Sequence, residues 1–345
     1  MSEPKMNSNN QTIKQSNNYL VWLEWPEKCF RVDAEALRYL KSVVPKGGRV
    51  VRVRSEEAFL RALPKATHAI VWEFKPEWFE KAPRLRMLAT PAAGQELVPI
   101  EGPKGVKIHF GHYHGQIIAE SVLGFMLCWA KGFFAVGRAP SAYRAWPRAW
   151  LSGKCFDVAG TKAVIVGYGH VGRAIGAKLM ALGVRVVGVT RHGIFRGEAE
   201  SFPLQNKDGS STRSGKDSAS PLLKDADWLI LALPSTTGTD NYLDAKLIRG
   251  LPRRCVVINV GRGNAVDERA LVAALRSGRL AGAYLDVCRR EHSEIWSKSK
   301  DARRTGVIDP ARRNVPTLVL MPHSAAFSPA YIVRSFEELK DDGCL

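Results

Sequence analysis

The stretch KAVIVGYGHVGRAIGAKLMALGVRVVGVTRH, residues 162–192, decides the fold. An apolar strand at 162–167 leads into a helix at 170–182, and a second apolar strand follows at 184–189. The segment GYGHVG stands between the first strand and the helix, which is the context that a G-x-G-x-x-G motif requires. The stretch therefore predicts a strand–helix–strand unit with a phosphate-binding turn.

The glycines of this turn have separate tasks. Gly167 permits the tight turn, Gly169 lets the backbone approach a pyrophosphate, and Gly172 allows close packing of the helix on the strand. The start of the helix offers free N–H groups to phosphates, so we expect His170 and Val171 to contribute main-chain contacts. The alternative is a glycine turn in an α/β domain that binds no ligand.

The end of the second strand bears on the choice of cofactor. Proteins that bind NAD usually place an acidic residue there, which binds the ribose 2′-hydroxyl. This chain has Thr190, Arg191 and His192 instead. Arg191 would attract a 2′-phosphate, so we expect NADP to be preferred, with NAD as the alternative. Arg191 as a solvated surface charge is the other reading.

Four more apolar strands follow, at 227–233, 255–260, 281–287 and 317–322. Their near-continuous apolar content indicates a doubly wound parallel sheet that is covered on both faces. In such a sheet ligands bind beyond the carboxyl ends of the strands. The residues expected at that edge besides the glycine turn and Thr190 are Pro234, Arg262, Asp286 and His323. Thr239, Val260 and Gly261 are further expected contacts of the cofactor. An arginine, an acid and a histidine beside a dinucleotide suggest hydride transfer.

The first part of the chain has the same alternation on a smaller scale. Strands are expected at 19–25, 49–54, 68–74, 86–92 and 106–111, with helices at 33–44 and 56–63, after a polar tail at 1–18. Residues 116–134 read as one long buried helix, and the Trp- and Arg-rich stretch 135–157 as an arm or linker. The polar segments 193–220 and 297–314 are expected to be surface loops or insertions.

Composition limits the class of protein. The chain has 345 residues, 45% of them hydrophobic and 24% charged, as in ordinary globular proteins of about two domains. No apolar run of about 18 residues predicts a membrane helix, and no secretory signal is apparent. Six scattered cysteines predict free thiols in a reducing cytoplasm and no metal site. The net charge of +18 attracts anions, but it is spread out and accompanies no nucleic-acid-binding motif.

Several segments together resemble the D-isomer-specific 2-hydroxyacid dehydrogenases. They are AAG at 92–94, AESVLGFML at 119–127, GYGHVG at 167–172, the long run from Ile258 to Val287, and MPHSAA at 321–326. The resemblance implies two Rossmann-like domains with a cleft between them. The flavodoxin-like substrate domain would comprise 19–115 and 327–345, and the NAD(P)-binding domain 116–326. It also implies a homodimer formed largely by the cofactor domains.

The resemblance assigns roles by position. Arg262 matches the arginine that binds the substrate carboxylate, His323 the acid/base histidine, and Glu291 the acid that supports this histidine. Asp286 matches a residue near the nicotinamide carboxamide, and the loop with Ala93 and Gly94 matches the one that holds the carboxylate. The implied reaction interconverts a 2-keto acid and a D-2-hydroxy acid.

These residue types suit that chemistry. A guanidinium grips a carboxylate with two hydrogen bonds, and a histidine titrates near neutrality and can exchange the hydroxyl proton. Each residue also has a plainer reading: Arg262 as a loop charge, His323 as a structural histidine and Glu291 as an exposed acid. Glu291 departs from the family pattern because a long basic insertion follows it.

Two further points stay open. His112 and His114 lie near the end of a strand of the first domain, where they would either touch substrate or be ordinary polar loop residues. The alternative function is that of a dinucleotide-sensing binding protein, because C-terminal-binding-protein corepressors are similar to this fold. Turnover of 2-keto acids would decide between the two.

Overall fold

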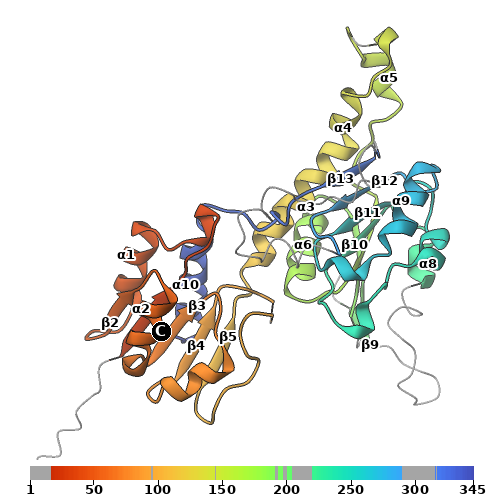
Figure 1. The fold of residues 1–345 in the computed structure, drawn as a ribbon. Helices are drawn as coiled ribbons and strands as arrows, with labels where there is room; N and C mark the ends of the chain where they lie inside the picture. Colours follow the sequence, from red (N-terminus) through yellow and green to blue (C-terminus); the bar gives the residue numbers. More distant parts are fainter. Residues whose placement is uncertain are drawn as a thin grey trace, which may run out of the picture. The chain divides into compact units, whose positions relative to one another are not determined.

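The computed structural model describes residues 17–94, 96–143, 145–190, 193–196, 200–203, 220–289, 315 and 317–345. The chain forms two compact units, which are described separately (Figure 1). The first contains the chain up to Gly111 together with Ser328–Leu345, and the second contains His112–Phe327. Of the predicted tail, 1–18, only Asn17 and Asn18 are among the described residues, and the first strand begins at Asn18.

The first unit is built on five parallel strands in the order β2-β1-β3-β4-β5. This is the flavodoxin-like order that the resemblance implied. The strands are β1 (Asn18–Trp22), β2 (Arg49–Arg52), β3 (His68–Val71), β4 (Met87–Thr90) and β5 (Lys107–Phe110). Short 3-10 turns lie at Lys28–Phe30, Leu63–Lys65 and Pro76–Lys81.

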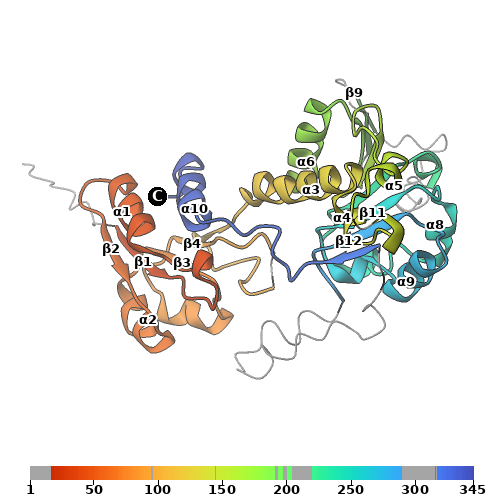
Figure 2. The same cartoon turned by 90° about the horizontal axis from the view of Figure 1, so that it is seen from above.

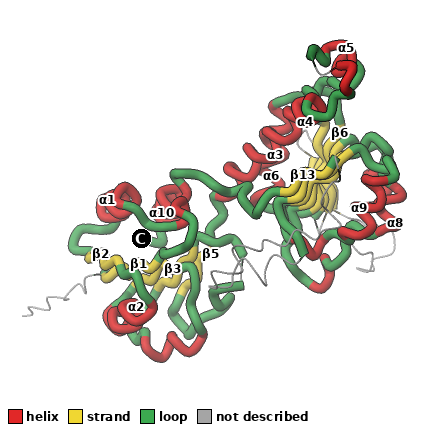
Figure 3. Tube along the Cα trace, turned by 45° about the horizontal axis from the view of Figure 1, so that its top comes forward, coloured by secondary structure: helices red, strands yellow, loops and turns green. Residues whose placement is uncertain are grey.

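Helices cover both faces of this sheet. Helices α1 (Ala34–Val43) and α10 (Tyr331–Asp341) lie on one face and α2 (Glu56–Ala62) on the other (Figure 3). The C-terminal helix α10 packs against α1, and the ring of its Tyr331 lies 4.6 Å from the ring of Phe30. These contacts bring the end of the chain back into the unit formed by its beginning.

The second unit contains an eight-stranded sheet in the order β13-β12-β11-β10-β6-β7-β8-β9. Six neighbouring strands are parallel: β6 (Lys162–Val166), β7 (Arg185–Val189), β10 (Trp228–Leu231), β11 (Val256–Asn259), β12 (Gly282–Leu285) and β13 (Leu318–Leu320). The strand order reverses between β6 and β10, which is where a doubly wound sheet binds its ligand.

Two layers of helices sandwich the second sheet (Figures 2 and 3). Helices α3 (His114–Ala130) and α6 (His170–Ala181) cover one face, and α8 (Ala245–Gly250) and α9 (Glu268–Arg276) cover the other. Successive residues of a strand point to opposite faces. Accordingly, Val257 packs in the core beneath α8 and α9, whereas Val256 and Ile258 pack beneath α3 and α6. Both sheet faces are buried, which explains the unbroken apolar runs in the sequence.

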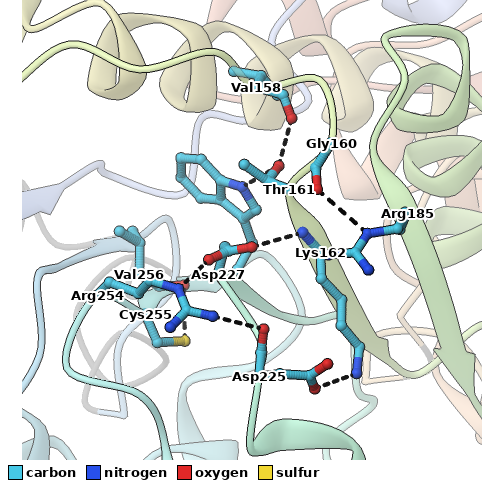
Figure 4. A network of polar contacts seen from close by, with 11 residues as sticks. Val158, Gly160, Thr161, Lys162, Arg185, Asp225, Asp227, Arg254, Cys255 and Val256 are labelled. Carbon is cyan, nitrogen blue, oxygen red and sulfur yellow. Dashed lines mark hydrogen bonds and ion pairs between the residues drawn. The ribbon is translucent and has the colours of Figure 1, made fainter.

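Hydrogen bonds and ion pairs connect the strands at the amino edge of this sheet, where the parallel strands begin (Figure 4). The carboxylate of Asp227 accepts a bond from the main-chain N–H of Lys162, at 2.8 Å, and pairs with Nε of Arg254, at 2.5 Å. The side chain of Lys162 pairs with Asp225 at 2.5 Å, which holds the pKa of that carboxyl below its ordinary value. These bonds link the starts of β6, β10 and β11.

The structure corrects two expectations. The segment 193–220 contains β8 (Gly193–Arg196) and β9 (Glu200–Pro203), an antiparallel hairpin that pairs with the edge of β7, where a surface loop was expected. A polar composition does not prevent pairing when a neighbouring strand offers its open edge.

The single helix expected at 116–134 ends at Ala130, and α4 (Phe133–Val136) follows Gly132, whose φ of 74° interrupts the helix. A short helix α5 (Arg148–Ser152) lies in the predicted arm.

Among the described residues, no helix is long and apolar enough to cross a membrane.

Candidate active site

The glycine turn joins β6 to α6. Gly167 has a φ of 94°, and a Cβ on it would overlap the carbonyl oxygen of Ala232 on the neighbouring strand connection. A Cβ on Gly172 would lie 2.5 Å from the carbonyl oxygen of Gly167, so this glycine lets α6 approach the turn. Both positions exclude any larger side chain.

The space in front of the helix suits an anion. Gly169 is the N-cap of α6, no side chain caps it, and no atom lies within 4 Å of the position that a Cβ on it would occupy. The first N–H groups of a helix have no partner within the helix, so those of His170, Val171 and Gly172 are available to a phosphate. The turn therefore fits the pyrophosphate of a dinucleotide.

The end of β7 lies against this turn. The carbonyl oxygen of Val189 accepts hydrogen bonds from the main-chain N–H groups of Gly167 and Tyr168, both at 3.0 Å. Thr190 follows directly, in the position expected of a residue near the ribose. Arg191, on which the expected preference for NADP depends, lies outside the described residues.

The loop after β10 runs from Pro234 into a 3-10 turn at Thr237–Thr239. The hydroxyl oxygen of Thr239 accepts a bond from the main-chain N–H of Thr236, at 3.0 Å, and lies 2.7 Å from the carbonyl oxygen of Pro234. The side chain of Thr239 therefore stabilises this loop. Its contact with the cofactor stays a prediction. A cavity of about 590 Å³ adjoins this loop and is lined by Ser235, Thr236, Thr237, Asp240 and Asn264.

Arg262 lies in the loop after β11, and the preceding Asn259 shapes that loop. The side chain of Asn259 is fully buried. Its Oδ1 accepts a bond from the main-chain N–H of Gly261, and its Nδ2 donates to the carbonyl oxygen of Arg262, both at 3.1 Å. Val260 is held to the adjacent strand by a bond from its N–H to the carbonyl oxygen of Leu231, at 3.0 Å.

Asn259 is a residue that sequence reasoning missed as part of the site. The available signal was an amide at the end of an otherwise apolar strand. A buried polar side chain needs partners, and the main chain beside Arg262 supplies them.

Asp286 and His323 meet at the ends of β12 and β13. The Asp286 carboxylate accepts bonds from the N–H groups of Ser324 and Ala325, both at 3.0 Å, and its carbonyl oxygen accepts one from the N–H of His323, at 2.8 Å. His323 has a φ of 53°, which is uncommon for a residue with a side chain. On the other side of this turn, Ser121 of α3 donates to the carbonyl oxygen of Ala325 at 2.9 Å.

These loops all follow the carboxyl ends of neighbouring parallel strands. The second unit thus places the glycine turn, Thr190, Pro234, Arg262, Asp286 and His323 along one edge of its sheet. Asp286, expected near the nicotinamide, is seen to hold the turn that carries His323.

The remaining predicted residues are placed as follows. Ala93 and Gly94 belong to the first unit, in the loop after β4, where the N–H of Ala92 donates to the hydroxyl of Thr90 at 3.2 Å. The ring of His112 stacks on that of His170 at 4.4 Å, so His112 borders the glycine turn. His114 is buried at the start of α3. Glu291 lies outside the described residues.

The doubly wound sheet, its glycine turn, and the arginine and histidine on the same edge define a dinucleotide-dependent oxidoreductase. A family model described as "D-isomer specific 2-hydroxyacid dehydrogenase, NAD binding domain" matches residues 123–325, more than half of the chain. The chain belongs to the D-isomer specific 2-hydroxyacid dehydrogenase family. It is an NAD(P)-dependent oxidoreductase that acts on the CH–OH group of 2-hydroxy acids, which confirms the expectation from sequence.

Relatives are similar in sequence to this chain along most of its length. A glyoxylate reductase of Thermococcus kodakarensis is 27% identical over 267 residues, 74% of each chain. A glycerate dehydrogenase of Methylorubrum extorquens is 26% identical over 281 residues, 78% of each chain. The crystal structure of a D-isomer specific 2-hydroxyacid dehydrogenase from Lactobacillus delbrueckii, in its NAD-complexed form, has the same fold. It has a TM-score of 0.68 and 18% identity, and the match covers 95% of this chain and 96% of that one.

Proposed function

We propose that the protein reduces a small 2-keto acid to the D-2-hydroxy acid, with glyoxylate and the keto acid of glycerate as the first substrates to test. The relatives named as glyoxylate reductase and glycerate dehydrogenase support this choice. The observation that carries the proposal is the shared sheet edge of Arg262 and His323, next to a glycine turn that fits a pyrophosphate.

Each residue has a defined task in this reaction. The guanidinium of Arg262 binds the substrate carboxylate through two hydrogen bonds and polarises the neighbouring ketone. His323 donates a proton to the ketone oxygen, and Glu291 stabilises the charged imidazole. Main-chain groups at Ala93 and Gly94 bind the carboxylate as well. The nicotinamide, when bound, supplies the hydride.

The cofactor contacts extend along the same edge. The N–H groups of His170, Val171 and Gly172 bind the pyrophosphate, which Gly167 and Gly169 let approach. Loop residues Pro234, Thr239, Val260 and Gly261 would surround the nicotinamide half of a bound cofactor, with Asp286 near its carboxamide. Thr190 would lie next to the adenosine ribose.

Variants at the two central residues test this assignment. His323→Ala is expected to lower kcat about 10²–10⁴-fold, as for a lost general acid, with little change in the Kd of the cofactor. Arg262→Lys is expected to impair both KM and kcat, because a point charge cannot reproduce a bidentate grip. Near-normal turnover of the best keto acid by His323→Ala would contradict the assignment, as would a complete lack of turnover by the wild type with every keto acid in a panel. The latter result would favour the binding role of the corepressor type.

We infer that NADP is the preferred cofactor, because Thr190 and Arg191 replace the acid that would repel a 2′-phosphate. A charge-assisted hydrogen bond is worth about 1.5–3 kcal/mol, so Arg191→Ala should raise the KM for NADPH roughly 10- to 150-fold. The KM for NADH should change little. Equal effects on the two cofactors would contradict the inference.

We also propose a homodimer. Phe133 and Trp146 are 69% and 77% exposed, and both lie along the stretch from α4 through the predicted arm. Large apolar side chains that are exposed in one subunit commonly mark an interface, and a symmetric dimer is the commonest oligomer. A cytoplasmic location remains a prediction from the sequence.

A further inference from the structure

Arg289, four residues after β12 ends at Leu285, connects several loops. Its Nη2 lies 2.6 Å from Oδ1 of Asn241, 2.9 Å from the carbonyl oxygen of Asn264 and 3.2 Å from Oδ1 of Asp240. Its main-chain N–H donates to the carboxylate of Glu268 at 2.8 Å. One residue thus makes four polar contacts.

The partners of Arg289 come from different parts of the site edge. Asp240 and Asn241 belong to the loop after β10, Asn264 to the loop after β11, and Glu268 to the first turn of α9. Since β10, β11 and β12 are neighbours in the sheet, Arg289 joins the three loops that follow them. Asn241 has a φ of 48°, so this loop adopts a conformation that needs support from its surroundings.

A close main-chain contact connects Arg289 to Arg262. Gly263 follows Arg262 directly, and a Cβ on Gly263 would overlap the carbonyl carbon of Cys288 and the main-chain nitrogen of Arg289. The loop therefore has support on two sides: Asn259 binds the main chain at Gly261 and Arg262, and the Cys288–Arg289 segment lies against Gly263 and binds Asn264.

We propose that Arg289 is a positioning residue for Arg262. By bonding Asn264 and the loop after β10, it holds the Gly263–Asn264 side of the Arg262 loop, so that the guanidinium of Arg262 is presented to the substrate carboxylate. The inference rests on the proposed role of Arg262 in binding that carboxylate. It assigns Arg289 no contact with substrate or cofactor.

An arginine suits this task. The three side-chain contacts all fall on one nitrogen of a planar, preorganised guanidinium. A lysine carries its charge on a more flexible stem and loses more freedom for each hydrogen bond, so it would hold Asp240, Asn241 and Asn264 less firmly. A small displacement of a substrate-binding group is costly, since a shift of about 1 Å lowers catalysis as much as about 100-fold.

The test measures carboxylate binding without turnover. Oxamate, an unreactive analogue of a 2-keto acid, is titrated into the complex of enzyme and reduced cofactor. Arg289→Ala should raise the Kd of oxamate about 10- to 100-fold and lower kcat/KM for the keto acid by a similar factor. Arg289→Lys should recover only part of the loss, and the Kd of the reduced cofactor should change less than about threefold.

A matched control is Arg254→Ala. Arg254 also bridges segments of the same sheet, through Asp227 and the carbonyl oxygen of Asp225, but at the amino edge (Figure 4). Its loss should leave the Kd of oxamate within about threefold of wild type.

A double variant separates positioning from general stability. If Arg289 acts through Arg262, then Arg289→Ala should add less than about a threefold effect to the Kd of oxamate in an Arg262→Ala background. Independent additive effects would overturn the inference, as would normal oxamate binding by Arg289→Ala when Arg262→Ala binds weakly. Normal binding by Arg262→Ala itself would instead refute the proposed role of Arg262, and this inference with it.

Discussion

Asn259 offers the sharpest test of how the sheet presents Arg262. Replacing it with alanine removes the acceptor for the N–H of Gly261 and the donor for the carbonyl oxygen of Arg262, both at 3.1 Å. Each main-chain group left without a partner in the interior costs about 1–3 kcal/mol. Gly261 is buried and Arg262 only partly so, and water can replace the lost donor at Arg262. We therefore expect Asn259→Ala to lower the free energy of unfolding by about 1–3 kcal/mol.

The same change should affect activity. The main chain at Arg262 loses its anchor, so kcat/KM for the keto acid should fall at least about tenfold. Unfolding is measured in urea by circular dichroism, and activity by oxidation of the reduced cofactor. Asn18→Ala is the matched control, because its side-chain bond to the carbonyl oxygen of Lys65, at 3.0 Å, is exposed and should contribute less than about 1 kcal/mol. If Asn259→Ala unfolds like the control and keeps normal activity, this reasoning about the Arg262 loop is refuted.

Three further predictions concern other parts of the chain. Burial and the nearby Arg86 lower the pKa of His68 from 6.5 to about 4, so the unfolded chain binds the additional proton between these values. The contribution of His68 to the free energy of unfolding is therefore complete above pH 6.5 and is lost as the pH falls toward 4. At pH 5 wild type should lose about 1–2 kcal/mol more than His68→Phe in urea unfolding, and parallel pH profiles would contradict this. Burial raises the pKa of Cys255 to about 12, whereas Cys155 is exposed. Iodoacetamide followed by mass spectrometry should therefore modify Cys155 and spare Cys255 in the folded protein, and equal labelling would contradict the burial of Cys255. Finally, Trp146→Glu should convert a dimer to a monomer in light scattering at micromolar concentration, and a wild-type monomer would exclude the proposed interface.

Much of the architecture could be predicted because it depends on short-range pattern. The prediction of two parallel α/β units and of family membership is confirmed. The strand–glycine–helix unit at 162–182 is readable because apolar runs, three spaced glycines and a helical period are all local properties. The carboxyl ends of parallel strands lie at one edge of a sheet, and this rule predicted that Arg262, Asp286 and His323 share that edge.

Long-range packing decided what a local pattern does not contain. The hairpin of β8 and β9 pairs with the open edge of β7, although the segment 193–220 as a whole is mostly polar and favours a loop. The partners of Asp286 and Arg289 lie in other loops, more than twenty residues away along the chain. Residue types and their order thus determined which chemical groups reach the sheet edge. Only the tertiary structure decided which polar groups hold them there, because a hydrogen bond between distant segments depends on the packing that brings donor and acceptor within bonding distance.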